Sequence, residues 1–220
     1  MSLYRGSKLF SNGSLLLIFF YILLGIFTYG LSFSVFGGWD PSFILYVPII
    51  IGIAGMGTAS LNFSKEKEFT WERGKQVALF IFLGSGILFL SILLLILVEW
   101  VDYDVIVYIG DVGLILSCIA YAVGFFFLQR QLAFLYLKRV IVRYPKYYAT
   151  IGFGVQAFAY AVFFINWFFT ENAIITATLV IIGIVFAAIS IILIAMGFIQ
   201  INIAFRAYPH LVENEELRPV

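Results

Sequence analysis

Residues 104–128 have the sequence DVIVYIGDVGLILSCIAYAVGFFFL, and this stretch decides the fold class. A bilayer core about 30 Å thick requires roughly 20 apolar residues in a helix, so the stretch is long enough to cross it. Runs such as SILLLILV at residues 91–98 do not alternate between polar and apolar side chains. Strands of a membrane barrel do alternate, so the pattern favours helices.

The composition excludes a water-soluble globule. Of the 220 residues, 63% are hydrophobic and 11% are charged. Soluble domains average about 45–50% apolar and about 25% charged residues, because charged side chains cover their surface. The chain lacks the polar residues for such a surface, so the composition predicts an integral membrane protein.

Six segments are long and apolar enough to span a membrane. They are residues 14–36, 42–60, 77–100, 104–128, 148–169 and 173–205. We therefore predict an all-α, multi-pass membrane protein. Residues 1–220 form a single bundle of six transmembrane helices, arranged as three hairpins.

The charged residues predict how this bundle is oriented. The turns after the first, third and fifth segments carry acids and no Lys or Arg. These acids are Asp40, Glu99, Asp102, Asp104 and Glu171. All 13 basic residues lie in the other loops and tails. Because Lys and Arg accumulate on the cytoplasmic side, we expect both termini to be cytoplasmic and the protein to lie in the plasma membrane.

Residues 129–147 mix apolar and basic side chains after the fourth segment. We expect a basic interfacial helical extension that Pro145 stops, and a polar C-terminal tail at residues 206–220. Four residues of the extension are candidates for binding lipid headgroups: Arg130, Lys138, Arg139 and Arg143. The general bias of basic residues toward the cytoplasm also accounts for these charges without a lipid site.

Asp111 is the only formally charged residue in the interior of the six predicted segments, since Glu99 and Asp104 lie at segment ends. It lies about 10 Å along a helix from the start of its segment. An acid at such depth is costly unless it is hydrogen-bonded, hydrated or protonated. Tyr108 lies one turn away, and Asn166 is at a comparable depth. Further polar candidates for the same cluster are Tyr29, Ser32, Thr176 and Thr178.

Two interpretations of Asp111 stay open at this point. In the first, Asp111, Tyr108 and Asn166 form a proton or cation site that opens to the outside. In the second, Asp111 is a buried acid that Tyr and Asn side chains satisfy, and it only stabilises the bundle. Gln156 and Tyr160 are expected to form hydrogen bonds between helices.

Several pairs of glycines predict close packing between helices. They are Gly84 with Gly86, Gly110 with Gly113, and Gly152 with Gly154. Small residues let helix backbones approach each other in a membrane. Cys118 is expected to be a small apolar packing residue.

The reactive residue types are too few for the familiar membrane redox sites. The chain has one Cys and one His, Cys118 and His210. This chain alone therefore lacks the ligands for a bis-histidine haem or a zinc site. We predict no cofactor, no metal ligands and no catalytic residues, and we expect no binding to nucleic acid.

Two classes of function remain. The first is an accessory or structural subunit of a larger membrane complex, with other membrane subunits or further copies of the chain as partners besides the bilayer. The second is a small transporter or an ion or proton channel that uses Asp111. A weaker third interpretation is lipid handling by the basic segment.

Overall fold

The computed structural model describes residues 71–98, 104–137, 146–169 and 171–206, with a few residues between 12 and 16 and ten between 47 and 58. Four long helices and one short 3-10 helix lie in the continuous parts. They are α3 (Trp71–Val98), α4 (Asp104–Leu137), α5 (Tyr148–Asn166), η1 (Trp167–Phe169) and α6 (Ala173–Arg206). No strand occurs among the described residues.

All four long helices are long and apolar enough to cross a membrane. The all-helical character is therefore confirmed for the described residues, and these four apolar helices are compatible with a multi-pass membrane protein. The predicted segment 14–36 falls almost wholly outside the described residues, whereas ten residues of segment 42–60 are described, all of them helical. The count of six spans and the orientation of the termini stay predictions.

Two helices extend beyond the predicted segments. The apolar stretch of α3 is Lys75–Leu97, and that of α4 is Val105–Phe134. Lys75 and Arg130 therefore lie within these stretches, although both fall outside the predicted segments 77–100 and 104–128 to which the expectation about Asp111 applies. Both basic side chains are exposed near the ends of their helices. Their long apolar stems allow the charged groups to reach the membrane surface.

The predicted extension at residues 129–147 begins as a direct continuation of α4, which runs on to Leu137. The helix continues because Leu128, Gln129 and Leu132 are all buried within the bundle. Residues 138–145 lie outside the described residues, so the interfacial position of this segment stays a prediction.

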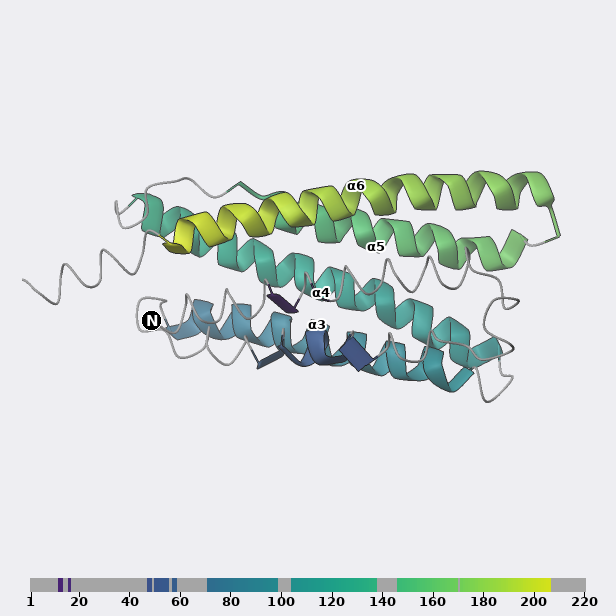
Figure 1. Ribbon diagram of the computed structural model, residues 1–220, viewed down its shortest axis with the longest axis horizontal. Coiled ribbons are helices and arrows are strands. Elements are labelled where there is room, and N and C mark those ends of the chain that lie inside the picture. The colour runs from purple at the N-terminus through teal and green to yellow at the C-terminus, as the bar shows by residue number, and fades with distance from the viewer. Residues whose placement is uncertain are drawn as a thin grey trace, which may run out of the picture.

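The helices pack as two antiparallel hairpins, α3 with α4 and α5 with α6, and α4 also packs against α5 (Figure 1). At one end of the α3–α4 pair, Gly124 lies against Ile81. At the other end, Gly110 lies against Leu95. The hairpins therefore place the start of α3 and the start of α5 at the same end of the bundle.

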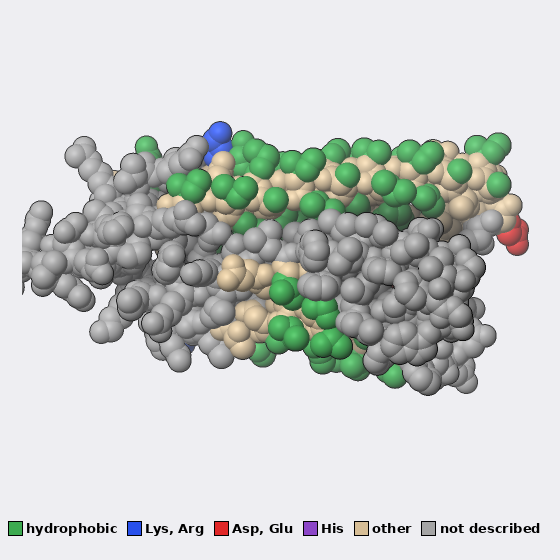
Figure 2. Space-filling model, viewed as in Figure 1, with side chains coloured by type: hydrophobic (Ala, Val, Ile, Leu, Met, Phe, Trp, Pro, Cys, Tyr) green, Lys and Arg blue, Asp and Glu red, His purple; other side chains and the backbone are tan. Residues whose placement is uncertain are grey.

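Charged side chains of the described part lie toward the ends of the helices. Lys75 begins the apolar stretch of α3 and Lys146 precedes α5, whereas Glu171 lies in the turn between α5 and α6. Between these ends, hydrophobic side chains cover the visible face of α6, with a basic group near one end and an acidic group near the other (Figure 2). This distribution is typical of a helix that crosses a bilayer.

Glycine brings the backbones of α5 and α6 close together. A Cβ atom at Gly152 would lie 2.8 Å from the backbone nitrogen of Ile194. A Cβ atom at Gly197 would lie 2.7 Å from the Cα atom of Ala149. Both distances are shorter than a carbon can tolerate, so only glycine permits this approach. The α5–α6 seam is therefore a close backbone contact.

Between α3 and α4, a glycine lies against an aromatic ring. A Cβ atom at Gly84 would lie 3.1 Å from the ring of Tyr121, whose hydroxyl group is 2.9 Å from the Ser85 hydroxyl group. By contrast, Cβ atoms at Gly86 and Gly154 would have no neighbour within 4 Å among the described residues. In the predicted pairs Gly84 with Gly86 and Gly152 with Gly154, the first glycine is therefore a packing residue between the described helices and the second is not.

An aromatic cluster joins the two hairpins. Phe125 of α4 stacks on Phe153 of α5 with ring centroids 5.2 Å apart, and the edge of one ring meets Phe198 of α6 at 5.4 Å. All three side chains are buried, as is Cys118 of α4, which confirms that Cys118 is a packing residue. The cluster ties α4, α5 and α6 into one unit.

The two kinds of glycine predict different responses to the same substitution. Gly197→Ala should lower the free energy of unfolding by about 1–3 kcal/mol, because the added methyl group forces α5 and α6 apart. Gly154→Ala should leave stability unchanged or raise it by about 0.5–1 kcal/mol, since alanine favours the helix. Equilibrium unfolding of the purified protein in mixed micelles, followed by circular dichroism, measures both. Equal effects of the two substitutions would contradict the close contact at Gly197.

Candidate functional site

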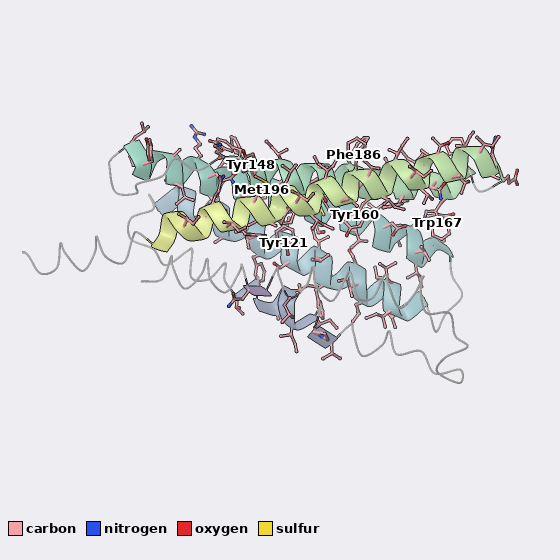
Figure 3. The ribbon with its side chains drawn as sticks, turned by 45° about the horizontal axis from the view of Figure 1, so that its top comes forward. Tyr121, Tyr148, Tyr160, Trp167, Phe186 and Met196 are labelled. Atoms are coloured by element: carbon pink, nitrogen blue, oxygen red, sulfur yellow. The ribbon has the colours of Figure 1, made fainter. Side chains whose placement is uncertain are left out.

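The carboxyl group of Asp111 is held by an indole. The Nε1–H group of Trp167 donates a hydrogen bond to Oδ2 of Asp111 across 3.0 Å. Asp111 is on the first part of α4 and is partly buried, whereas Trp167 begins η1. Figure 3 shows Trp167 near the end of the bundle where α5 passes into α6. The bond therefore links the two hairpins at that end.

The change from α5 to η1 sets the position of Trp167. Its backbone N–H group bonds to the carbonyl group of Phe164, which tightens the end of the helix into a 3-10 turn. After this turn, the side chain of Asn172 accepts a bond from the backbone N–H of Ile175 at 3.3 Å and so caps α6. Asn is among the residues that most favour this position at the start of a helix.

Tyr108 contributes ring contacts to the site. Its ring meets Trp167 edge to face at 6.0 Å between centroids and lies nearly parallel to Phe168 at 6.1 Å. A third contact, with Phe164, is edge to face at 6.1 Å. Tyr108 therefore supports the indole that binds Asp111. The sequence places Tyr108 beside Asp111, and the structure connects the two through Trp167.

Asn166 precedes Trp167 and has an unusual environment. Its Oδ1 atom is buried and has no hydrogen-bond partner in the part of the chain that the structure describes. A buried amide oxygen without a partner costs about 1–3 kcal/mol. Asn166 and Asp111 are thus brought to neighbouring helices at the same end of the bundle, but no bond joins them.

The other polar candidates are engaged elsewhere or lie outside the described residues. The hydroxyl group of Thr176 donates to the carbonyl of Phe169 at 2.8 Å, and that of Thr178 donates to the carbonyl of Ile174 at 2.8 Å. These bonds satisfy the threonines locally, within the turn and within α6. The remaining two candidates, Tyr29 and Ser32, are outside the described residues.

The candidate headgroup-binding residues are placed only in part. Arg130 is exposed on α4. The other three, Lys138, Arg139 and Arg143, are outside the described residues, so a lipid site at this segment stays a prediction.

A second polar network joins α4, α5 and α6 at the end of the bundle opposite to Asp111. Fully buried Gln129 of α4 donates to the backbone carbonyl of Lys146 at 2.8 Å and accepts a bond from the Thr150 hydroxyl at 2.6 Å. The backbone N–H of Lys146 donates to Gln200 of α6 at 3.3 Å. Sequence reasoning missed this network. The signal that indicates this network is the position of Gln129, which falls on the buried face of the helix if the predicted segment 104–128 continues as a helix.

The expected hydrogen bond from Gln156 to another helix is confirmed. The hydroxyl group of Ser190 on α6 donates to the amide oxygen of Gln156 on α5. Ser190 is fully buried, so this bond satisfies two polar groups within the seam. Tyr160 packs against the hydrophobic core.

Metal-ligating side chains do not gather in the described part of the chain, where no three His, Cys, Asp or Glu residues come together. Comparisons with protein-family models, curated proteins and solved structures found nothing that matches this chain. The site is therefore characterised by its own geometry: one carboxyl group, one indole donor and an amide oxygen nearby in sequence.

A double-mutant cycle tests the bond between Asp111 and Trp167. Asp111→Ala and Trp167→Phe should each destabilise the protein, and their coupling energy should be about 0.6 kcal/mol and at most about 1.7 kcal/mol, the average and the maximum for hydrogen bonds between membrane helices. Phenylalanine keeps the ring contact with Tyr108 and removes only the donor. The measurement is unfolding in mixed micelles.

The control cycle pairs Trp167→Phe with Thr178→Val. Thr178 bonds within its own helix, so the two effects should add without coupling. Additive effects in the Asp111 cycle as well would show that the indole bond contributes nothing to stability.

Proposed function

We propose that the chain is an accessory or structural subunit of a larger membrane assembly, with α6 as its contact surface. The observation that carries the proposal is the one-sided packing of α6. Among the described helices its extensive contacts are with α5 alone, and its apolar stretch has the smallest buried share of the four. Exposed isoleucines recur along α6, and Figure 2 shows hydrophobic side chains along its visible face.

The polar groups of the described spans support the same proposal. Apart from the Oδ1 atom of Asn166, the buried ones bond across the seams between helices, as in Ser190 with Gln156 and Tyr121 with Ser85, or to the nearby backbone. Polar residues used in this way hold a bundle together. A rigid bundle with an apolar outer helix suits a protein that positions other subunits in the membrane.

Site-specific photocrosslinking tests the proposed surface. A photoreactive residue at Ile184 or Ile192 of α6, which are 57% and 60% exposed, should give crosslinks to one partner chain when the protein is in its own membrane. The control is Leu79 of α3, which is 58% exposed and should give lipid adducts. Native mass spectrometry of the purified complex should then give a fixed stoichiometry for the same partner.

Two results bear on the choice of partner. Crosslinks between two copies of this chain at the α6 positions would identify self-association. Lipid adducts alone at all three positions would exclude α6 as a subunit contact and overturn the proposal.

A second candidate function is a proton or cation site at Asp111. The observation in its favour is the buried Oδ1 atom of Asn166, which lacks a partner among the described residues beside a helix that carries a carboxylate. An unsatisfied oxygen and a carboxylate within a membrane span are typical of sites that take up a proton or cation.

Flux measurements separate the two candidates. If the chain conducts protons or cations, Asp111→Asn should abolish the flux into proteoliposomes, because it removes the ionisable group. Thr178→Val should not change the flux, since Thr178 bonds to its own helix. The same background flux for the wild-type chain, Asp111→Asn and empty liposomes would eliminate the transport candidate and leave the subunit proposal untouched.

A further inference from the structure

The depth of the bonded pair Asp111 and Trp167 in a membrane follows from the opposite end of the bundle. Arg130 and Lys146 lie at one level there, because Gln129, the neighbour of Arg130, donates a hydrogen bond to the carbonyl of Lys146 at 2.8 Å. Asp111 lies about 28 Å from Arg130 along α4. On α5, Trp167 lies about 30 Å from Lys146. The charged groups of Arg and Lys reach a membrane surface and a bilayer core is about 30 Å thick, so the opposite surface lies near Asp111 and Trp167.

Aromatic rings gather around this pair. The ring of Tyr108 lies 6.0 Å from that of Trp167 and 6.1 Å from that of Phe168, measured between centroids. Phe164 meets Phe168 edge to face at 5.6 Å. Trp and Tyr side chains are enriched at membrane surfaces, where their rings lie at the level of the lipid headgroups. The rings therefore support the same depth as the distances from the basic residues.

Two of these rings and one carboxyl oxygen are open to a ligand. Phe168 is 66% exposed and Trp167 is 45% exposed. One face of Phe168 lies against Tyr108, so its other face is the open one. Trp167 bonds to Oδ2 of Asp111, and among the described residues nothing bonds to Oδ1. The carboxyl group is only partly buried, so Oδ1 can face a ligand.

The charges at this end of the bundle are negative. The described residues here contain no Lys, Arg or His that could neutralise the carboxyl group of Asp111. They contain a second exposed carboxyl group, Glu171, in the turn between α5 and α6. Asp111 is thus an anion beside aromatic rings at a membrane surface, and the ligand that complements it is a cation.

The groups that the site offers select the kind of cation. A metal ion such as Ca²⁺ takes about six or more oxygen ligands, and no three His, Cys, Asp or Glu residues come together in the described part of the chain. Aromatic faces attract organic cations, and quaternary ammonium groups such as choline are bound in this way. A quaternary ammonium group has no N–H donor, so one carboxylate beside open rings is sufficient for it.

We propose that Asp111, Trp167 and Phe168 bind a quaternary ammonium group, such as the choline headgroup of a phosphatidylcholine. A lipid suits the depth of the site, because headgroups are more concentrated at a membrane surface than a dissolved amine is. The inference does not depend on the subunit role. It shares Asp111 with the second candidate function, but it requires binding alone and no flux.

The test is competition between two lipids for the full chain, in nanodiscs with equal amounts of dioleoyl phosphatidylcholine and dioleoyl phosphatidylethanolamine. These lipids differ only in the methyl groups on nitrogen. Native mass spectrometry should find phosphatidylcholine as the lipid that stays bound after collisional activation. Asp111→Asn should reduce this retention about tenfold, because it removes the charge and keeps the size of the side chain. The matched control is Glu171→Gln, which removes the other carboxylate of this end and should not change retention.

A second pair of variants covers the case in which Asp111→Asn fails to fold. Phe168→Leu removes an exposed ring and should reduce the retained phosphatidylcholine about threefold. Its control is Phe158→Leu, because Phe158 is 51% exposed on α5 and packs on Phe186, away from the rings around Asp111. This substitution should leave retention unchanged.

Dissolved choline distinguishes the two sources of the ammonium group. If the ligand is a lipid, an excess of choline chloride should leave the retained phosphatidylcholine in place. Displacement of the lipid by choline would support the same ammonium site and assign it to a dissolved compound.

Two outcomes would overturn the proposal. The first is equal retention of phosphatidylcholine and phosphatidylethanolamine by the unaltered chain, which would show that the rings do not select the methylated nitrogen. The second is an equal loss in Asp111→Asn and Glu171→Gln, which would indicate a general effect of charge. Neither result changes the expected crosslinks of α6 or the flux into proteoliposomes, so this proposal fails separately from the proposed functions.

Discussion

Close contact between helix backbones is the constraint on which the structure depends. Lipid is as apolar as the helix surfaces, so burial of hydrophobic side chains does not drive the helices of a membrane protein together. Association then relies on van der Waals contact and on hydrogen bonds, and both require short distances. Gly152 and Gly197 supply those distances between α5 and α6, because a Cβ atom at either would meet the neighbouring helix below 3 Å. Gly84 does the same under the ring of Tyr121, where a Cβ atom would have slightly more room, at 3.1 Å.

The polar side chains of the bundle follow from these contacts. Once two helices lie close, Ser190 reaches Gln156 and Tyr121 reaches Ser85. Each bond satisfies groups that would otherwise be unpaired in an apolar medium. Asp111 belongs to the same set, since it accepts a bond from Trp167. The acid thus has a partner from the other hairpin, and α4 and α5 are linked at one end by this bond and at the opposite end through Gln129 and Thr150.

Sequence reasoning predicted the site only in part, and the particular residues show why. The cost of an acid within an apolar segment indicates that Asp111 has a partner, and helical spacing points to Tyr108. The donor is instead Trp167, whose position depends on the 3-10 turn after α5 and on the packing of α5 against α4. Likewise, Gly84 and Gly86 are equivalent in sequence, but only Gly84 faces another helix. Spacing along one helix gives the face that a residue occupies and does not give the neighbour on that face.

Composition and the length of apolar runs determined by themselves that the chain is a helical membrane protein, because every backbone polar group within a bilayer must be satisfied inside its own segment. They also determined where the helices at residues 148–169 and 173–205 begin and end, within a few residues. Tertiary structure alone decided which residues meet: the indole with the carboxyl group and with the ring of Tyr108, and the glutamine with the serine. These pairings depend on distances between helices, and such distances are set by the sizes of side chains on both partners at once.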